Sequence, residues 1–178
     1  MKKIIFFTYT LILFGLSIQS IGQSVEKLDE KFGFKSFKFG SPPNKEKSII
    51  VNSWEKKQNI ETYQYTGNDM DQLYGAEIEA ILLEYFNNKL ISIMVVFKSP
   101  FLESDYKPVL FSLQQLFGNG GNCISENPEF SNSSGRKWIG EKVEMELLNF
   151  LDKKNSNWSG YLAVTNKSLQ RQRLNDEF

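Results

Sequence analysis

The clearest structural signal in the 178-residue chain is a pair of β-rich runs separated by three polar residues. Residues 76–86 spell AEIEAILLEYF and residues 90–98 spell LISIMVVFK, with Asn87-Asn88-Lys89 between them. Asparagine tolerates the left-handed backbone geometry that a tight turn between antiparallel strands requires. The second run is apolar on both faces. We therefore expect a hairpin whose second strand is central and covered by a helix.

That helix is expected directly after the hairpin, over residues 103–117. Pro100 breaks the preceding strand, Ser104 offers a cap for the first turn, and Gly118 ends the helix. The apolar side chains recur every three or four residues and so form a single stripe. They are Tyr106, Val109, Leu110, Leu113, Leu116 and Phe117.

The other elements are marked less sharply. We expect a helix over 24–33, strands near 34–39 and 60–66, a long loop or weak edge strands over 118–135, a second hairpin from 136–150 and 158–165, and a frayed helix from Lys167. Together they predict a single α+β domain over residues 23–178. Its antiparallel sheet has about six strands in two hairpin-based halves, with helix 103–117 packed on one face.

A weak internal repeat relates those halves, about 34–98 and 101–165. A shift of 65 positions sets Ile78 on Val143 and Leu82 on Leu147. A degenerate duplication would make each half a helix or turn followed by an antiparallel hairpin. Chance similarity between two amphipathic strands is the alternative, and the sequence leaves both open.

The first 22 residues have the three-part order of a cleavable secretory signal peptide. Two lysines precede the apolar run 4–16, and the small residues Ser20 and Gly22 stand before a cut at Gln23. A membrane span needs about 20 apolar residues, more than this run offers. We expect a protein that is periplasmic or secreted, with no integral membrane segment after cleavage.

Composition narrows the chemistry of the exported part. Residues 1–22 hold two lysines and no acids, so 19 basic and 21 acidic side chains remain, a formal net charge of −2. This balance favours neither nucleic acid nor anionic membrane as a partner. The chain has no histidine, which excludes a Ser-His-Asp triad and a typical zinc site. Cys123 is the single cysteine, so no intramolecular disulfide forms and no lipid-attachment cysteine stands at the cleavage site.

One family resemblance rests on the run Phe37-Lys38-Phe39-Gly40-Ser41, a Tyr-rich strand, and the segment 83–90, LEYFNNKL. Over residues 34–165 this layout resembles uncharacterised exported bacterial proteins. It is similar to the helix-plus-β-meander modules of outer-membrane assembly lipoproteins and β-lactamase-inhibitor-like proteins. A signal ending in Gly22-Gln23 resembles exported proteins of the Bacteroidetes type. The resemblance implies a protein-binding module without enzymatic activity, and the missing lipid-attachment cysteine departs from the lipoprotein pattern.

Four polar features suggest chemistry, each with a plainer structural explanation. Two pairs of glutamates are each two positions apart, so each pair is expected to share one side of a strand: Glu77 with Glu79, and Glu144 with Glu146. Each pair is either a catalytic acid and base or part of a solvated sheet face. Segment 68–71, NDMD, resembles the start of a calcium loop but lacks its later ligands, which favours a turn. Segment 118–122, GNGGN, follows a helix, whereas phosphate loops precede one.

Three further features are equally ambiguous. Cys123 has no histidine to activate it, so a small buried residue, a free thiol or an intermolecular bridge are the alternatives. The aromatic side chains line a ligand surface or, by default, belong to the core; they are the tryptophans at 54, 138 and 158 together with the seven tyrosines. The basic tail is formed by Lys167, Arg171 and Arg173 and is explained by a solvated helix end.

These observations assign no catalytic, cofactor-binding or metal-binding residue and no cofactor. We expect an exported, non-enzymatic binding module of the bacterial envelope whose partner is another envelope or extracellular protein. Two alternatives stay open: a carboxylate-dependent hydrolase acting on glycans, and a small-ligand carrier with an aromatic pocket. The oligomeric state is left open as well.

Overall fold

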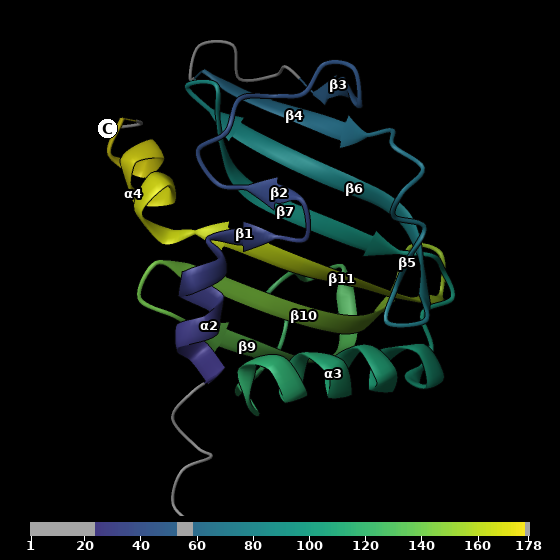
Figure 1. The fold of residues 1–178 in the computed structure, drawn as a ribbon. Coiled ribbons are helices and arrows are strands. Elements are labelled where there is room, and N and C mark those ends of the chain that lie inside the picture. Colours follow the sequence, from purple (N-terminus) through teal and green to yellow (C-terminus); the bar gives the residue numbers. More distant parts are fainter. Residues whose placement is uncertain (1–23, 53–58, 177–178) are drawn as a thin grey trace, which may run out of the picture.

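A computed structural model describes residues 24–52 and 59–176. The fold is α+β, with three helices, a nine-stranded antiparallel sheet and a separate two-stranded sheet (Figure 1). The prediction of about six strands is therefore too low. The elements are α2 (Ser24–Lys31), β1 (Gly33–Phe34), β2 (Phe37–Lys38), β3 (Ser48–Asn52), β4 (Ile60–Tyr65), β5 (Gln72–Leu73), β6 (Ala76–Phe86), β7 (Lys89–Phe97), α3 (Glu103–Phe117), β8 (Gly121–Cys123), β9 (Phe130–Ile139), β10 (Val143–Asp152), β11 (Asn157–Asn166) and α4 (Lys167–Asp176).

Two meanders make up the large sheet. Its order is β3-β4-β6-β7-β11-β10-β9-β8, with the short β5 pairing separately to β6. The last strands of the two meanders, β7 and β11, therefore meet at the centre and pair antiparallel. We call β3 to β7 the first half and β8 to β11 the second half. The outer strands, β3 and β8, form the two edges of the sheet.

The hairpin predicted from residues 76–98 is confirmed as β6 and β7. Asn87 and Asn88 have φ values of 49° and 63°, the left-handed geometry that their side chains tolerate. The hairpin of the second half comprises β10 and β11. The sequence assigned 136–150 to one strand of that hairpin, which is wrong: β9 ends at Ile139, and β10 starts at Val143 and pairs back with it.

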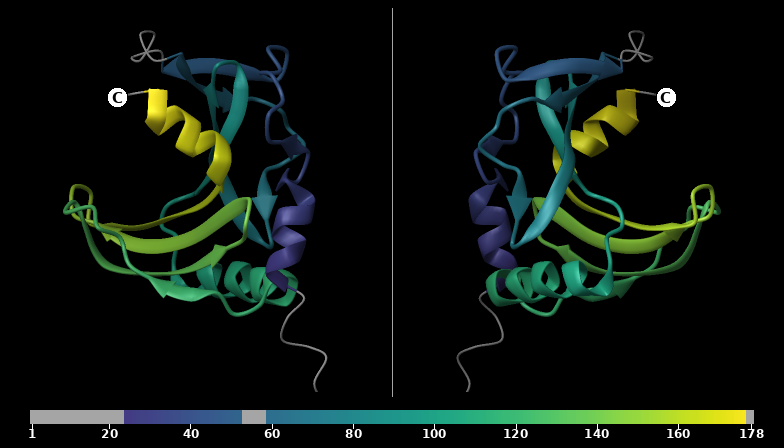
Figure 2. Two further views of the ribbon diagram at one scale, coloured as in Figure 1. Left: turned by 90° about the vertical axis from the view of Figure 1, so that its left-hand side faces the viewer. Right: turned by 90° about the vertical axis from the view of Figure 1, so that its right-hand side faces the viewer.

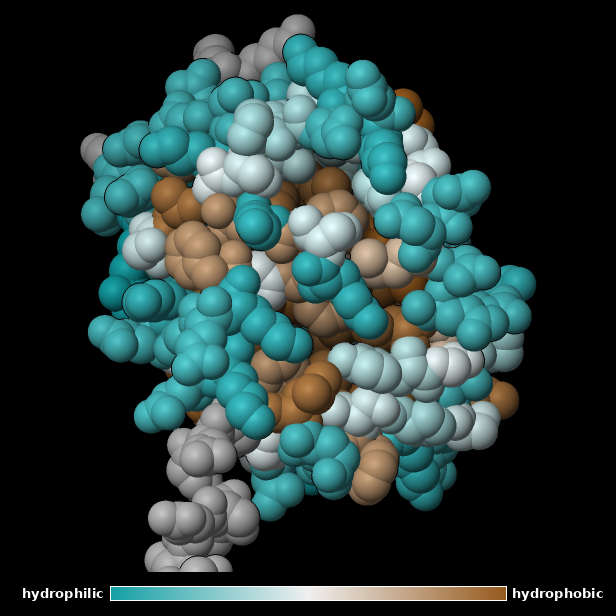
Figure 3. Space-filling view, viewed as in Figure 1, coloured by the Kyte–Doolittle hydropathy of each residue, from teal (hydrophilic) through white to brown (hydrophobic). Residues whose placement is uncertain are grey.

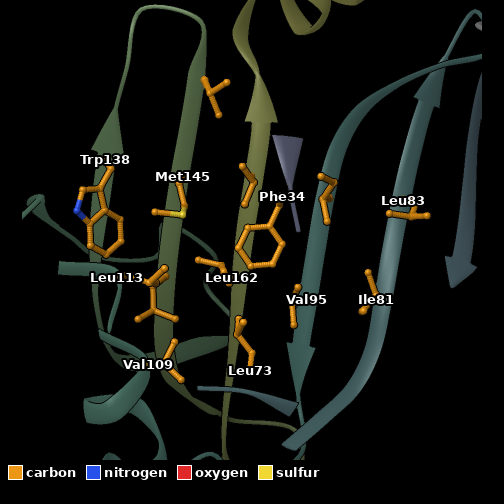
Figure 4. Close-up of a cluster of buried hydrophobic side chains, with 14 of the residues drawn as sticks. Phe34, Leu73, Ile81, Leu83, Val95, Val109, Leu113, Trp138, Met145 and Leu162 are labelled. Atoms are coloured by element: carbon orange, nitrogen blue, oxygen red, sulfur yellow. The ribbon is translucent and has the colours of Figure 1, made fainter. Parts of the chain in front are cut away.

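The amphipathic helix is confirmed over 103–117 as α3. The cap predicted at Ser104 is wrong, because the N-cap position is Leu102. Its amide is bound by the carboxylate of Asp105, 3.0 Å away, and an acid is favourable at this end of a helix. The apolar stripe lies against the second half of the sheet, with Val109 and Leu113 pointing towards β9 and β10 (Figure 4).

The two faces of the sheet are covered differently. The core face carries Ile81, Val95, Leu162 and Met145, and α2, α3 and the β1–β2 sheet pack on that side (Figures 1 and 4). The opposite face, which we call the open face, is concave and is partly covered by α4 (Figure 2). Leu169 of α4 packs there against a small apolar cluster formed by Ile60, Phe86 and Ile91.

A bulge in β6 changes which residues of the internal repeat lie on the same face of the sheet. The irregularity in β6 between Ile78 and Ala80 shifts its side chains to the other face. Leu82 consequently shares the open face with its partner Met94, whereas Leu147 lies on the core face beside Leu162. The shift of 65 therefore does not keep equivalent faces along the whole strand, and the duplication stays a prediction.

The signal-peptide prediction falls on residues 1–22, outside the described residues. Among the described helices, none has the length and apolarity needed to cross a membrane.

Candidate binding site

A pocket lies on the core side of the first half, where the segment after β2 arches over β4 and β6. We call it the aromatic pocket. Its volume is about 310 Å³. It is lined by Ser36, Phe37, Lys38, Ser41, Pro42, Asn44, Lys47, Ser48, Tyr65, Asp69, Leu83 and Tyr85. In the space-filling view of this side, apolar atoms show in the middle of the face within a hydrophilic surround (Figure 3).

Strand alternation explains the apolar inner surface of the pocket. Leu83 and Tyr85 are two apart on β6 and so point to the same face, where both are buried. Tyr65, at the end of β4, packs edge-to-face on Phe37 of β2 with ring centroids 5.1 Å apart. Burial, with Tyr63 beside it, raises the pKa of Tyr85 to about 12, so this phenol is neutral at physiological pH.

Backbone hydrogen bonds hold the outer wall in place. The amide of Gly40 donates to the carbonyl of Leu90, and the amide of Leu90 donates to the carbonyl of Ser41, both at 2.9 Å. Further along, the Ser48 hydroxyl donates to the carbonyl of Asn44. The wall is thus tied to β7 at one end and leads into β3 at the other. A pocket fixed in this way needs little ordering when a ligand enters.

A hydrogen-bonded pair forms part of the rim. The Tyr65 hydroxyl donates to Oδ1 of Asp69 at 2.5 Å. This bond lowers the pKa of Asp69, and the positive charge of Lys47 lowers it further. The same bond, followed by burial and the charge of Asp69, raises the pKa of Tyr65. A side chain at Gly67 would disturb the pair, because its Cβ would lie 2.2 Å from the Tyr65 hydroxyl oxygen.

An exposed edge strand borders this pocket. β3 starts at Ser48, which lines the pocket, and continues with three consecutive apolar residues. Ile49, Ile50 and Val51 are 56%, 49% and 46% exposed. β3 pairs with β4 on one side, and within the described residues no strand pairs with its other side.

The acidic pairs lie elsewhere. Glu77 and Glu79 border a shallow depression beside Asp71, but Glu77 is ion-paired with Lys98 at 2.6 Å and its side chain is 56% exposed. A glycosidase acid instead needs an apolar, water-poor setting that keeps it protonated. The expectation that Glu144 and Glu146 share a side is confirmed on the open face, because Lys137 contacts them at 2.8 and 3.8 Å.

The two loop motifs have structural roles. In the segment 68–71, Asp69 is bound by Tyr65, and the carbonyl of Asp71 accepts the amide of Ile78 at 2.8 Å. The Gly118 amide closes the end of α3 by donating to the carbonyl of Gln114 at 2.8 Å. Both segments thus serve as the turn and the helix end that the sequence favoured.

Cys123 and two of the tryptophans, Trp138 and Trp158, lie in the second half. Cys123 is a half-buried free thiol on β8, and burial followed by the charge of Glu146 raises its pKa. This is the opposite of what activates a nucleophile. Trp138 is buried in the core, with its indole N–H donating to the carbonyl of Gly118 at 2.7 Å. Trp158 is half-buried on β11, and Trp54 lies outside the described residues.

The basic tail forms α4, which is capped by Asn166 through its side-chain oxygen. Lys167 donates to the carbonyl of Gly140 at 2.7 Å, and Arg173 pairs with Glu84 across the open face. Arg171 is exposed. The tail therefore anchors α4 on the sheet.

No protein-family model matches the chain, and no curated protein or solved structure is significantly similar to it. The resemblance to envelope lipoprotein modules thus stays a prediction.

The tryptophans and the seven tyrosines predict an aromatic ligand surface only in general terms, and the sequence does not locate the aromatic pocket. The useful signal was the alternation of tyrosine in β4, with Tyr63 and Tyr65 two positions apart. Such spacing puts two large aromatic side chains on the same face of a strand. Nothing local indicated that Phe37 would pack on that face.

Proposed function

We propose that this protein is an exported, non-enzymatic binding module that captures an extended segment of another envelope or extracellular protein along β3. The observation that carries the proposal is the row of three exposed apolar side chains on an edge strand. Natural sheets usually protect their edges with short strands, charges, proline or covering loops. β3 has neither a charge nor a proline within Ser48–Asn52, and its three apolar side chains are exposed.

The other edge of the same sheet serves as an internal reference. β8 has only three residues, Gly121–Cys123, and two of them are small or polar and exposed. Such an edge offers few backbone groups and little apolar surface to a partner. The contrast supports β3 as the edge suited to strand addition, in which backbone hydrogen bonds give affinity and side-chain contacts give specificity.

Charge indicates what kind of segment would fit. Lys45, Glu46 and Lys47 precede β3 and are all exposed, which leaves one net positive charge beside the strand. A partner strand with apolar side chains and an acidic residue at the matching end would complement this surface. The absence of histidine and the ion-paired, exposed state of Glu77 support binding over hydrolysis.

Site-specific photocrosslinking in the producing cells tests this proposal. A photoreactive residue at position 49 should give one discrete adduct with another exported protein, and the crosslinked peptide should be an apolar segment with an acidic end. The substitution Ile50→Lys should remove the adduct by placing a charge in the apolar row. The matched control is a photoreactive residue at Ile139 of the second half, which is 57% exposed and should give no such adduct.

Three results would contradict the proposal. An adduct between two copies of this chain would mean that β3 pairs with itself. Equal adducts from positions 49 and 139 would mean unspecific contact. No adduct at position 49 would mean that the edge has no partner.

A further inference from the structure

We infer that the aromatic pocket binds a single-ring molecule carrying one carboxylate. This site borders the proposed strand-capture edge and shares Lys47 and Ser48 with it, but the inference does not depend on that proposal. Its volume of about 310 Å³ stands at the lower end of the range of about 300–1,000 Å³ typical of ligand pockets. A single ring fits such a space, whereas a nucleotide or a long acyl chain needs more.

The inner surface favours a ring. Phe37 and Tyr65 stand edge-to-face at the wall, and Leu83 and Tyr85 form a buried apolar floor. Aromatic side chains pack well against the apolar face of a flat or puckered ring. The wall and floor come from β2, β4 and β6, which are held by sheet and backbone hydrogen bonds, so the space exists before a ligand enters.

The rim favours a negative group on that ring. Two lysines, Lys38 and Lys47, line the pocket together with a single acid, Asp69. The Asp69 carboxylate already accepts the Tyr65 hydroxyl and lies in the field of Lys47. Among the described residues Lys38 has no ion-pair partner, so it is the lysine of the lining that is left to meet a carboxylate from a ligand. The Ser41 and Ser48 hydroxyls already donate to backbone carbonyls, which leaves the Ser36 hydroxyl and the Asn44 side-chain amide for polar ring substituents.

Two kinds of molecule share this chemistry: an acidic sugar and an aromatic acid. Glucuronate and 4-hydroxybenzoate represent them as probes, and glucose and phenol are their neutral counterparts. Titration of each probe into the purified protein, followed by NMR chemical shifts of the backbone amides, reports both affinity and location. We expect at least one acid to shift the amides of Phe37, Lys38 and Tyr65, and its neutral counterpart to bind about ten-fold more weakly or worse.

A matched pair of variants isolates the charge. Lys38→Gln should weaken binding of the acid by about ten-fold, which corresponds to loss of one charge-assisted contact. Lys35→Gln, in the same β1–β2 segment, should leave binding unchanged, because Lys35 lies over the ring of Tyr74, 5.3 Å from its centroid. Both lysines are exposed, so neither change should alter folding, which the thermal midpoint checks.

The results distinguish a sugar acid from an aromatic acid as the ligand, and they test the pocket independently of the strand-capture proposal. Binding of glucuronate supports a sugar acid, and binding of 4-hydroxybenzoate supports an aromatic acid. Any of three results would overturn the inference. Neither acid binds at about 10 mM, the neutral counterparts bind as well as the acids, or Lys38→Gln leaves binding unchanged. Ile50→Lys should bind the acid as the wild type does, so a failed titration leaves the strand-capture proposal intact.

Discussion

The two halves of the sheet have similar strand layouts but different covers on the core face. The second half is covered by α3, a 15-residue helix whose inner residues Val109, Leu113 and Phe117 are almost completely buried. The first half is covered by β1 and β2, two strands of two residues each, and by the segments around them. A regular helix fills the face with closely spaced side chains, whereas the irregular cover leaves the aromatic pocket.

The two kinds of cover assign binding and stability to different halves of the sheet. A close-packed core does not tolerate loss of a side chain, because the cavity that remains is filled only partly by relaxation. A face that contains a pocket has fewer close side-chain contacts, so truncation of a side chain there costs less stability. We therefore expect the second half to carry more of the stability and the first half to carry the ligand contacts. Substitutions in each half test whether stability and ligand contacts are divided in this way.

The largest effect is expected from Leu113→Ala in α3. Leu113 is fully buried in the core, so truncation should destabilise the protein by about 2–5 kcal/mol. The control is Phe111→Ala on the same helix, where the side chain is 62% exposed and the change should stay within about 0.5 kcal/mol. Urea unfolding measures both. Equal effects of the two substitutions would mean that α3 does not hold the second half together.

The next effect concerns the contact that joins α2 to the second half. The Asp29 carboxylate accepts the backbone amides of Glu141, Lys142 and Val143 at 2.6–2.8 Å, in the turn between β9 and β10. Partial burial acts to raise the pKa of Asp29, but the three hydrogen bonds together hold it below its usual range. Asp29→Asn should destabilise the protein by about 1–3 kcal/mol, because one of the oxygens is replaced by a donor.

The pH dependence of this contact has a definite sign. A carboxyl group with a lowered pKa in the folded state contributes stability above its unfolded pKa of about 3.9 and loses it as the pH falls through the folded value. The difference in unfolding free energy between wild type and Asp29→Asn should therefore be constant near neutrality and shrink below about pH 4. A difference that does not change with pH would contradict the role of the charge.

Contacts such as that of Asp29 also explain which features the sequence could predict. Helix 103–117 and the hairpin at Asn87-Asn88 depend on spacing and turn chemistry within a few residues, and both were predicted correctly. The turn after Ile139 depends on a carboxylate more than 100 positions away in the chain, so its position could not be read locally. β3 was missed because its apolar run is short and lies in a polar segment.

The same distinction applies to the candidate site. The aromatic residues were visible in the sequence, but the pocket requires Phe37, Tyr65 and Tyr85 to converge from three strands. Such convergence depends on register and on the two bulges of the β6–β7 hairpin, one in each strand, which no local pattern specifies. The individual side chains were therefore predictable as aromatic packing residues, and their meeting point was not.

A smaller effect is expected from Gly67→Ala at the rim of the aromatic pocket. The added Cβ would lie 2.2 Å from the Tyr65 hydroxyl oxygen and 2.7 Å from Oδ1 of Asp69, so these two side chains must separate. Loss of the hydrogen bond should bring the pKa of Tyr65 back towards its ordinary value of about 10, with a stability change below about 1 kcal/mol. Ultraviolet titration of tyrosine ionisation measures the shift.

Gly121→Ala is the matched control in the second half. A Cβ there meets only a carbonyl oxygen at 3.9 Å, an ordinary contact, and should leave the tyrosine titration unchanged. If Gly67→Ala also leaves the titration unchanged, the Tyr65–Asp69 bond does not set the pKa. If Gly67→Ala unfolds the protein, the first half is packed as tightly as the second half, contrary to our expectation.

The smallest effect is expected at the thiol of β8, the protected edge of the second half. Burial and the charge of Glu146 raise the pKa of Cys123, although Lys137 and Arg136 act in the other direction. A raised pKa lowers the thiolate fraction at about pH 8, so alkylation by iodoacetamide should be slower than for a free cysteine. Glu146→Gln should speed the reaction slightly, and unfolding in urea should remove the protection. Alkylation of the folded protein as fast as in urea would mean that β8 opens readily. The two edge strands, β3 and β8, would then differ only in the chemistry of their side chains.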